Sequence, residues 1–169
     1  IIHHLIFNSV YDWWDNHFIY DSYSCRNGKG TLFGIRRLDH HIRAVSNNYA
    51  RPAYVLKLDI QGYFMSLPRK ELYQRAVWGL NREFEGRLNT REYDTIKFLW
   101  QRTIMDDPIK GARKKGDLKG WEKLPASKSL FNQPKGKGIV IGNLTSQLLS
   151  NIYLDQLDRF ITLELGYRH

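Results

Sequence analysis

The sequence predicts a mixed fold of helices and a small sheet, of the α/β (α+β) class. Over several stretches apolar residues recur every three or four positions, which is typical of amphipathic helices. Residues 54–59 are rich in β-branched and aromatic side chains and alternate in polarity, which favours a strand. Residues 106–138 are basic, contain several glycines and prolines, and have almost no apolar periodicity. Helices therefore supply most of the expected fold, with one strand and one long basic loop between them.

The expected helices have recognisable ends. Thr31, Ser66 and Thr90 are candidate N-caps, because a side-chain hydroxyl can accept a hydrogen bond from a free amide of the first turn. Pro68 then falls in a first turn, where proline is tolerated, and Gly166 ends the last helix. Within the second helix, we expect its apolar residues Leu38, Ile42 and Val45 to face inward. The expected helices span residues 2–18, 31–46, 67–78, 90–104 and 144–165.

Composition limits the classes of function. The chain has 169 residues, of which 42% are hydrophobic, enough for one domain with a sizeable core. Its net charge of +9 favours a polyanionic partner, although a merely basic protein would carry the same excess. Cys25 is the only cysteine, so neither an internal disulfide nor a cysteine-based zinc site can form. No apolar run approaches the roughly 20 residues of a membrane span, and no signal peptide opens the chain, so we expect a cytoplasmic protein without membrane contact.

The first segment with chemical potential is residues 57–64. The expected strand delivers one carboxylate, Asp59, to its end, and Gly62 then allows a tight turn. A lone aspartate in this position is usually a cap for the next turn. A polymerase site needs two divalent ions about 3.5–4 Å apart, and therefore several carboxylates from different strands. Asp59 can supply only one of them.

The second segment is residues 138–147. Gly138 and Gly142 flank an apolar tripeptide and allow the backbone to approach a ligand closely, and a polar run then opens the last helix. On spacing alone an ordinary helix entry, capped by Asn143 or Thr145, is the favoured interpretation.

In this order, the two segments resemble motifs A and B of the reverse transcriptase family. Residues 27–31 are similar to the basic fingers segment of bacterial members, and residues 3–6 fit the helix before it. The resemblance runs nearly from end to end. It implies partial fingers in residues 1–50 and a partial palm in residues 51–169, with residues 106–138 as a basic loop insertion.

The second segment is most similar to the reverse transcriptases of diversity-generating retroelements. Most of the family has glutamine before the motif B glycine and Ser-Pro after it, whereas this chain has Ile141 and then Ser146-Gln147. Relatives with this pattern copy template adenines with errors. The resemblance therefore implies low fidelity.

The resemblance also implies roles for single residues. Asp59 would bind both catalytic magnesium ions, helped by the carbonyl of Ile60, and the amides near Gly62 and Tyr63 would face the triphosphate. Phe64 would exclude a 2′-hydroxyl by its bulk. Ile141, Gly142 and Gln147 would line the nucleotide site. The residues expected to hold phosphates are Arg26, Lys29, Lys110, Arg113, Lys114 and Lys115.

The activity that the resemblance implies is RNA-directed DNA synthesis with two Mg²⁺ ions, an RNA template, a DNA or RNA primer and deoxynucleoside triphosphates. The family's next motif, an aspartate pair on a hairpin, and its thumb would follow residue 169, so we expect the fragment alone to be inactive. Asp106-Asp107 does not replace that pair, because it precedes motif B and runs into Pro108. The alternative is a reverse-transcriptase-like module that binds nucleic acid for defence or as a scaffold, without templated synthesis.

Overall fold

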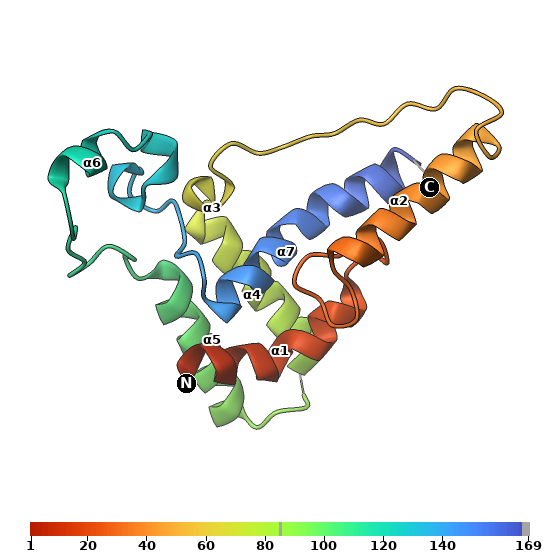
Figure 1. Ribbon diagram of the computed structural model, residues 1–169. Coiled ribbons are helices and arrows are strands. Elements are labelled where there is room, and N and C mark those ends of the chain that lie inside the picture. The colour runs from red at the N-terminus through yellow and green to blue at the C-terminus, as the bar shows by residue number, and fades with distance from the viewer. Residues whose placement is uncertain (85, 167–169) are drawn as a thin grey trace.

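The computed structural model describes residues 1–84 and 86–166, and in them the chain is mostly helical (Figure 1). The described residues contain no β-strand, only an isolated antiparallel bridge between Pro68 and Lys137. The α-helices are α1 (Ile2–His17), α2 (Thr31–Ser46), α3 (Tyr63–Ser66), α4 (Arg69–Phe84), α5 (Thr90–Met105), α6 (Leu118–Glu122) and α7 (Leu144–Arg159). The 3-10 helices η1 (Ala126–Lys128) and η2 (Leu130–Asn132) and the π-helix η3 (Phe160–Glu164) complete the order.

The hydrophobic core lies among α1, α4, α5 and α7, which pack against one another in Figure 1. Each helix turns an apolar stripe inward, as the sequence periodicity predicts. Full burial of one such side chain stabilises the fold by about 1.5–3 kcal/mol. The buried residues include Ile6, Val10 and Trp14 of α1, Leu72, Ala76 and Leu80 of α4, Trp100 and Ile104 of α5, and Leu148, Leu149 and Ile152 of α7.

A glycine sets how closely α1 and α4 approach. Gly79 lies in the middle of α4 and is buried, and a Cβ atom there would overlap the rings of Trp13 and Trp14. Trp14 is itself only 2% exposed and packs edge-on or tilted against the rings of Trp13 and Trp78. The glycine therefore costs helix propensity but permits the indole cluster.

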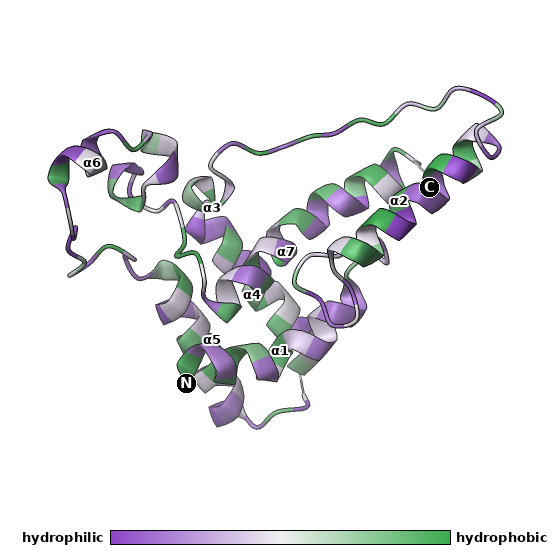
Figure 2. Cartoon of the chain, in the orientation of Figure 1, coloured by the Kyte–Doolittle hydropathy of each residue, from purple (hydrophilic) through white to green (hydrophobic). Residues whose placement is uncertain are grey.

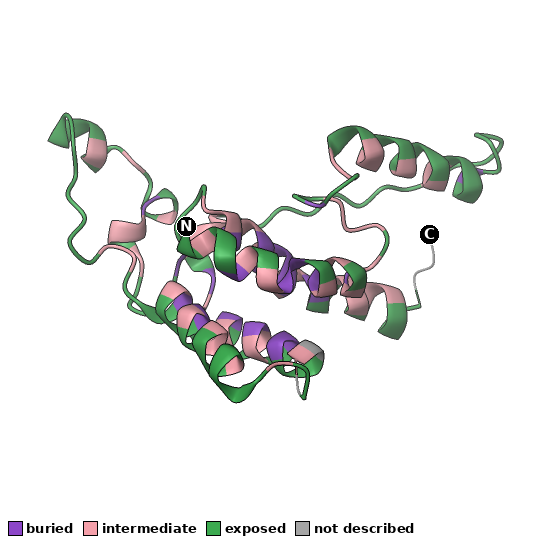
Figure 3. Cartoon of the chain, turned by 90° about the horizontal axis from the view of Figure 1, so that it is seen from below, coloured by how far each residue is buried: buried purple, intermediate pink, exposed green. Residues whose placement is uncertain are grey.

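Helix α2 stands apart from this core (Figure 3). Its N-terminus follows the loop of residues 18–30, and no other helix of the described residues packs extensively against it. Leu38 and Val45 are 48% and 49% exposed, and Ile42 is half-buried. The expectation that these residues face inward was wrong for Leu38 and Val45, whose side chains remain half exposed, and Ile42 is only partly covered.

The strand expected at residues 54–59 is not formed. The chain runs extended from the end of α2 to α3 (Figure 1), but none of the backbone groups of residues 52–61 makes a hydrogen bond to another described residue. A strand exists only through its ladder with a neighbour. The sequence pattern therefore specified the extended conformation without specifying a partner.

Most helix boundaries agree with the sequence to within a residue or two, but α4 continues to Phe84, six residues beyond the expected end at Trp78. The N-cap of α5 is Asn89, whose side chain accepts the amide of Glu92 at 3.0 Å, and Thr90 is the first helical residue. Ser66 ends the short α3 instead of capping the next helix. The long last helix changes to a π-helix after Arg159, and Gly166 follows it with φ of 66°.

The basic segment is not wholly irregular. Asp117 caps α6 by accepting the amide of Lys119 at 3.0 Å, and η1 and η2 follow. None of the helices in the described part of the chain is both long and apolar enough to span a bilayer.

Candidate functional site

Asp59 and Ile60 lie in the exposed, extended segment before α3. The Asp59 carboxylate has no hydrogen bond or ion pair to any described residue, and Ile60 is 46% exposed. The carboxylate is therefore free to bind a ligand, but the described chain does not fix its orientation.

The turn after this segment requires a glycine. Gly62 adopts the left-handed conformation, with φ of 61° and ψ of 35°, at the N-cap of α3. A Cβ atom there would lie 2.6 Å from the carbonyl oxygen of Ser127. Gly62 is therefore required twice, for its backbone angles and for the close contact with η1.

Tyr63 and Phe64 turn their side chains toward the helical core. The Tyr63 hydroxyl donates to the carbonyl of Ser150 in α7 at 2.8 Å, and burial raises the pKa of Tyr63 to about 12. Phe64 packs against the core and meets the Tyr63 ring edge-on, with centroids 5.4 Å apart. These rings fasten the turn to α7.

The two sequence segments that resemble polymerase motifs are adjacent in space. The amide of Ile139 donates to the carbonyl of Phe64 at 3.0 Å, and the amide of Gly138 donates to Leu67 at 2.9 Å. Gly138 has φ of 82°, and a Cβ atom there would lie 2.5 Å from Leu130 and 3.0 Å from the Met65 carbonyl oxygen. Residues 64–69 and 136–139 thus form one packed unit.

The rest of the second segment is exposed. Ile141 is 61% exposed, and Gly142 has φ of 98° with open space where a Cβ would lie. Asn143 is the N-cap of α7 and makes no side-chain cap bond, whereas its carbonyl accepts the amide of the half-buried Gln147 at 3.2 Å. The turn at Ile141 and Gly142 therefore presents backbone to solvent at the start of a long helix.

The described residues do not assemble a site for two magnesium ions. No group of three or more His, Cys, Asp or Glu side chains in the described ranges converges closely enough to hold a metal. Asp106 pairs instead with Arg102 at 2.8 Å, and Asp107 accepts the amide of Ile109 at 3.2 Å. Since one carboxylate does not hold two ions, no catalytic step through a metal follows from these residues.

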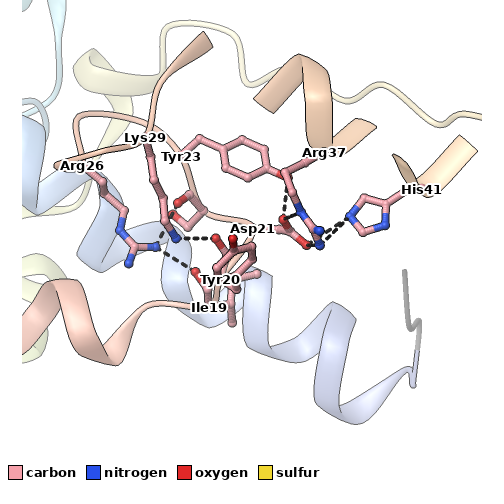
Figure 4. A network of polar contacts seen from close by, with 9 residues as sticks. Ile19, Tyr20, Asp21, Tyr23, Arg26, Lys29, Arg37 and His41 are labelled. Carbon is pink, nitrogen blue, oxygen red and sulfur yellow. Dashed lines mark hydrogen bonds and ion pairs between the residues drawn. The ribbon is translucent and has the colours of Figure 1, made fainter. Parts of the chain in front are cut away.

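Arg26 is buried in a network of the loop before α2 (Figure 4). Its guanidinium donates to the side chain and carbonyl of Asp15 at 2.7 and 2.6 Å, and to the carbonyls of Ile19 and Ser22 at 2.8 and 2.9 Å. This expected phosphate ligand is 7% exposed and ties the loop to α1.

Asp21, which the sequence did not single out, is the centre of the neighbouring network in Figure 4. It accepts from Arg37 at 2.6 and 2.8 Å, lies 3.1 Å from His41, and accepts the Tyr23 hydroxyl at 2.9 Å. The hydrogen bonds from Arg37 hold the pKa of Asp21 well below its usual range, and burial raises the pKa of Tyr23 to about 12. The i, i+4 spacing of Arg37 and His41 is the one sequence signal for this network.

The remaining basic residues are more accessible. The half-buried Lys29 donates to the Tyr20 carbonyl at 2.5 Å and lies 4.4 Å from the Tyr20 ring centroid, and burial lowers its pKa. In the basic segment, Lys110, Arg113, Lys114 and Lys115 are all exposed. Lys114 lies 5.7 Å from the ring centroid of Trp121. A cation beside a partly exposed aromatic ring can contact both phosphate and base.

A cavity of about 760 Å³ at the start of α7 was not expected from the sequence. Arg69 lines it and is 5% exposed; its Nη1 donates to the Asp106 carbonyl at 2.6 Å, whereas its buried Nε has no partner in the described chain. Most of the lining is apolar, and Arg102 and Asp106 at its edge neutralise each other. The cavity therefore has no clear charge preference.

Comparisons of the chain with protein-family models, with curated proteins and with solved structures found no match.

Proposed function

We propose that the chain is part of a reverse transcriptase, an RNA-directed DNA polymerase that extends a primer on an RNA template. The observation that carries the proposal is the contact between residues 64–69 and 136–139. These ranges overlap, at Phe64 and at Gly138-Ile139, with the two segments that resemble motifs A and B, which such a polymerase uses on one nucleotide. Their adjacency supports a common site for Asp59, Gly142 and the amides between Gly62 and Phe64.

On this proposal the chain contributes a scaffold with one acidic ligand. Asp59 would be one of several carboxylates, and the exposed turn of Ile141 and Gly142 would lie beneath the nucleotide. Lys110, Arg113, Lys114 and Lys115 are positioned on an exposed surface suited to phosphates, because such contacts position a strand without reading its sequence. The buried Arg26 has no such role in the proposal.

A diversity-generating type of reverse transcriptase is the subclass that we propose, on the basis of Ile141 and the Ser146-Gln147 pair. The α/β palm belongs to the same proposal, because the unpaired segment at residues 54–59 has a strand-like pattern. Mg²⁺, deoxynucleoside triphosphates, an RNA template and a DNA or RNA primer are the corresponding ligands.

The second candidate is a module that binds nucleic acid without templated synthesis. It is favoured by the position of Asp59, which belongs to no group of three or more potential metal ligands in the described chain. The basic segment would then carry the whole function.

One experiment separates the two. Primer extension on an RNA template is measured for the complete gene product and for its Asp59→Asn variant, together with template binding. The polymerase proposal predicts extension that Asp59→Asn reduces by at least about a thousandfold, on the order of the loss of a key charge-stabilising group, with template binding unchanged. Absence of extension by the unmodified protein, with tight binding retained, would favour the binding module. Parallel loss of binding and extension would make Asp59 a structural residue.

A further inference from the structure

The extended segment between α2 and α3 has an unpaired backbone along its length. Residues 52–61 make no backbone hydrogen bond to the described chain, and no side chain of the described chain bonds to them. In Figure 1 the segment crosses open space without a neighbouring element. A row of free N–H and C=O groups is the feature by which a sheet edge recruits another strand.

The side chains of this segment also have the pattern of a strand. In an extended chain, residues two apart lie on the same face, and hydrophobic and hydrophilic residues alternate along the segment in Figure 2. Leu56, Leu58 and Ile60 share one face and are 81%, 70% and 46% exposed. Lys57 and Asp59 share the other face, and neither has a partner in the described chain. An apolar row this exposed is typical of a contact surface.

We propose that residues 55–61 pair with the same residues of a second copy of this chain, as an antiparallel two-stranded ribbon centred on Leu58. In this register Leu58 lies opposite Leu58 of the second copy, and Leu56 opposite Ile60. Each Lys57 lies opposite Asp59 of the other copy, so the twofold axis produces two identical ion pairs. Cross-strand pairs of opposite charge and of apolar residues both stabilise a ribbon.

The charges select this register from its neighbours. A ribbon centred on Lys57 or on Asp59 places like charges opposite each other. A shift by one residue brings charged side chains to the apolar face, because the side-chain period of a strand is two. Parallel pairing in register stacks Lys57 on Lys57 and Asp59 on Asp59. Only the arrangement centred on Leu58 matches charge with opposite charge and apolar with apolar.

This inference does not rest on the proposed function. It uses the exposure, the alternation and the two charges of the segment, whereas the proposed palm would pair the same segment within its own sheet, so the two proposals compete for these residues. Because a two-stranded ribbon is weak on its own, the association is expected to depend on concentration. The ribbon also engages Asp59, so the dimer and a ligand at that carboxylate would compete.

Reciprocal charge exchange is the first test. Sedimentation velocity over about 1–200 µM gives the dimer dissociation constant. Lys57→Glu and Asp59→Lys should each raise it by about tenfold or more, because each creates two like-charge pairs. The double variant Lys57→Asp/Asp59→Lys restores opposite charges and should return it to within about threefold of the starting value. Lys70→Glu and Asp94→Lys, at exposed positions on α4 and α5, are matched controls for net charge and should leave it unchanged.

Disulfide trapping tests the register. In a Cys25→Ser background, Leu58→Cys places two thiols directly opposite, within the roughly 4.4–6.8 Å between Cα atoms that a disulfide spans. Leu56→Cys separates the thiol-bearing Cα atoms by about 14 Å, from four residues of strand rise and one strand spacing. With a mild oxidant, the first variant should form a linked dimer and the second should not.

Three outcomes would overturn the inference. If the protein is monomeric over the whole concentration range, the proposed dimer does not form. If neither single charge exchange changes the dissociation constant, the proposed register is wrong. Equal cross-linking at positions 56 and 58 would mean non-specific contact between apolar segments.

Discussion

The apolar side chains of the helical core and those of residues 53–60 end in opposite environments. In α1, α4, α5 and α7 the apolar stripes cover one another, so that Trp14, Leu72 and Trp100 are almost fully buried. In the extended segment Leu56 and Leu58 remain 81% and 70% exposed. A helix satisfies its own backbone and needs only a packing partner, whereas a strand needs a neighbour for its backbone as well. The helices therefore fold on local information, and the segment that carries Asp59 depends on something outside it.

The largest expected effect is the difference between removing an apolar side chain from the helical core and removing one from the extended segment. Trp14→Ala should lower the free energy of unfolding by about 3–5 kcal/mol, because it empties the centre of the indole cluster. Leu58→Ala should change it by less than about 0.5 kcal/mol in the monomer, because the side chain is already in water. Urea unfolding at low protein concentration measures both. A large loss from Leu58→Ala would mean that the segment packs against the core in solution.

The half-buried Asp21 network can be compared with the exposed ion pair between Asp39 and Arg43 on α2. Asp21→Asn should lower the free energy of unfolding by about 1.5–3 kcal/mol at neutral pH, since it removes charge-assisted bonds from Arg37. The folded-state pKa of Asp21 lies below its unfolded value. Its contribution is therefore complete above about pH 4 and is lost as the pH falls through the folded pKa.

The pH dependence supplies the control. Urea unfolding between pH 7 and pH 2 should show a steeper acid loss in the unmodified chain than in Asp21→Asn. Asp39→Asn removes an exposed carboxylate that is paired with Arg43 on the same helix, and its effect should be smaller. Equal acid profiles for the unmodified chain and Asp21→Asn would contradict the network.

The basic segment can be compared with the basic residues of the core helices. If about four phosphates are contacted, the affinity for an RNA–DNA primer–template should fall with salt at a log–log slope of about −3 to −4. Replacing the four basic residues of the segment with alanine should flatten that slope. A matched replacement on α4 and α5 removes equal charge and should leave it unchanged. The two sets are Lys110, Arg113, Lys114 and Lys115, and Lys70, Arg82, Arg91 and Lys97. Equal slopes for the unmodified protein and for the variant with four alanines in the basic segment would show that this segment does not contact phosphates.

The sequence predicted which segments are helical better than it predicted which residues each side chain contacts. Periodicity located the long helices. The sequence also predicted Gly62 as a turn residue and Gly138 as a point of close backbone approach, and these residues contact Ser127 and Met65 in the structure. It could not place Arg26, because a guanidinium can bind a phosphate or pair with a carboxylate such as that of the half-buried Asp15. It could not find Asp21, whose partner Arg37 lies sixteen residues away.

The absence of pairing at residues 54–59 in the described chain and the cavity beside Arg69 could not be predicted for the same reason: both depend on contacts between distant segments. The alternation at residues 54–59 predicts an extended chain, but pairing is a property of two segments, and the described chain holds only one. Nothing in the sequence singles out Arg69, and only the packing of α5 and α7 around it makes the cavity.

The contact between residues 64–69 and 136–139 carries the functional account, and hydrogen exchange at the Ile139 amide tests it directly. Gly138→Ala should accelerate that exchange by about tenfold or more, because the new Cβ would press on Leu130 and the Met65 carbonyl in addition to straining a left-handed backbone. Gly136→Ala is the matched control, because Gly136 has φ of 86° and open space around its Cβ position. Hydrogen exchange at the Ile139 amide should be clearly faster in Gly138→Ala than in Gly136→Ala. Equal exchange in the two variants, or an unprotected Ile139 amide in the unmodified chain, would contradict the adjacency of the two segments.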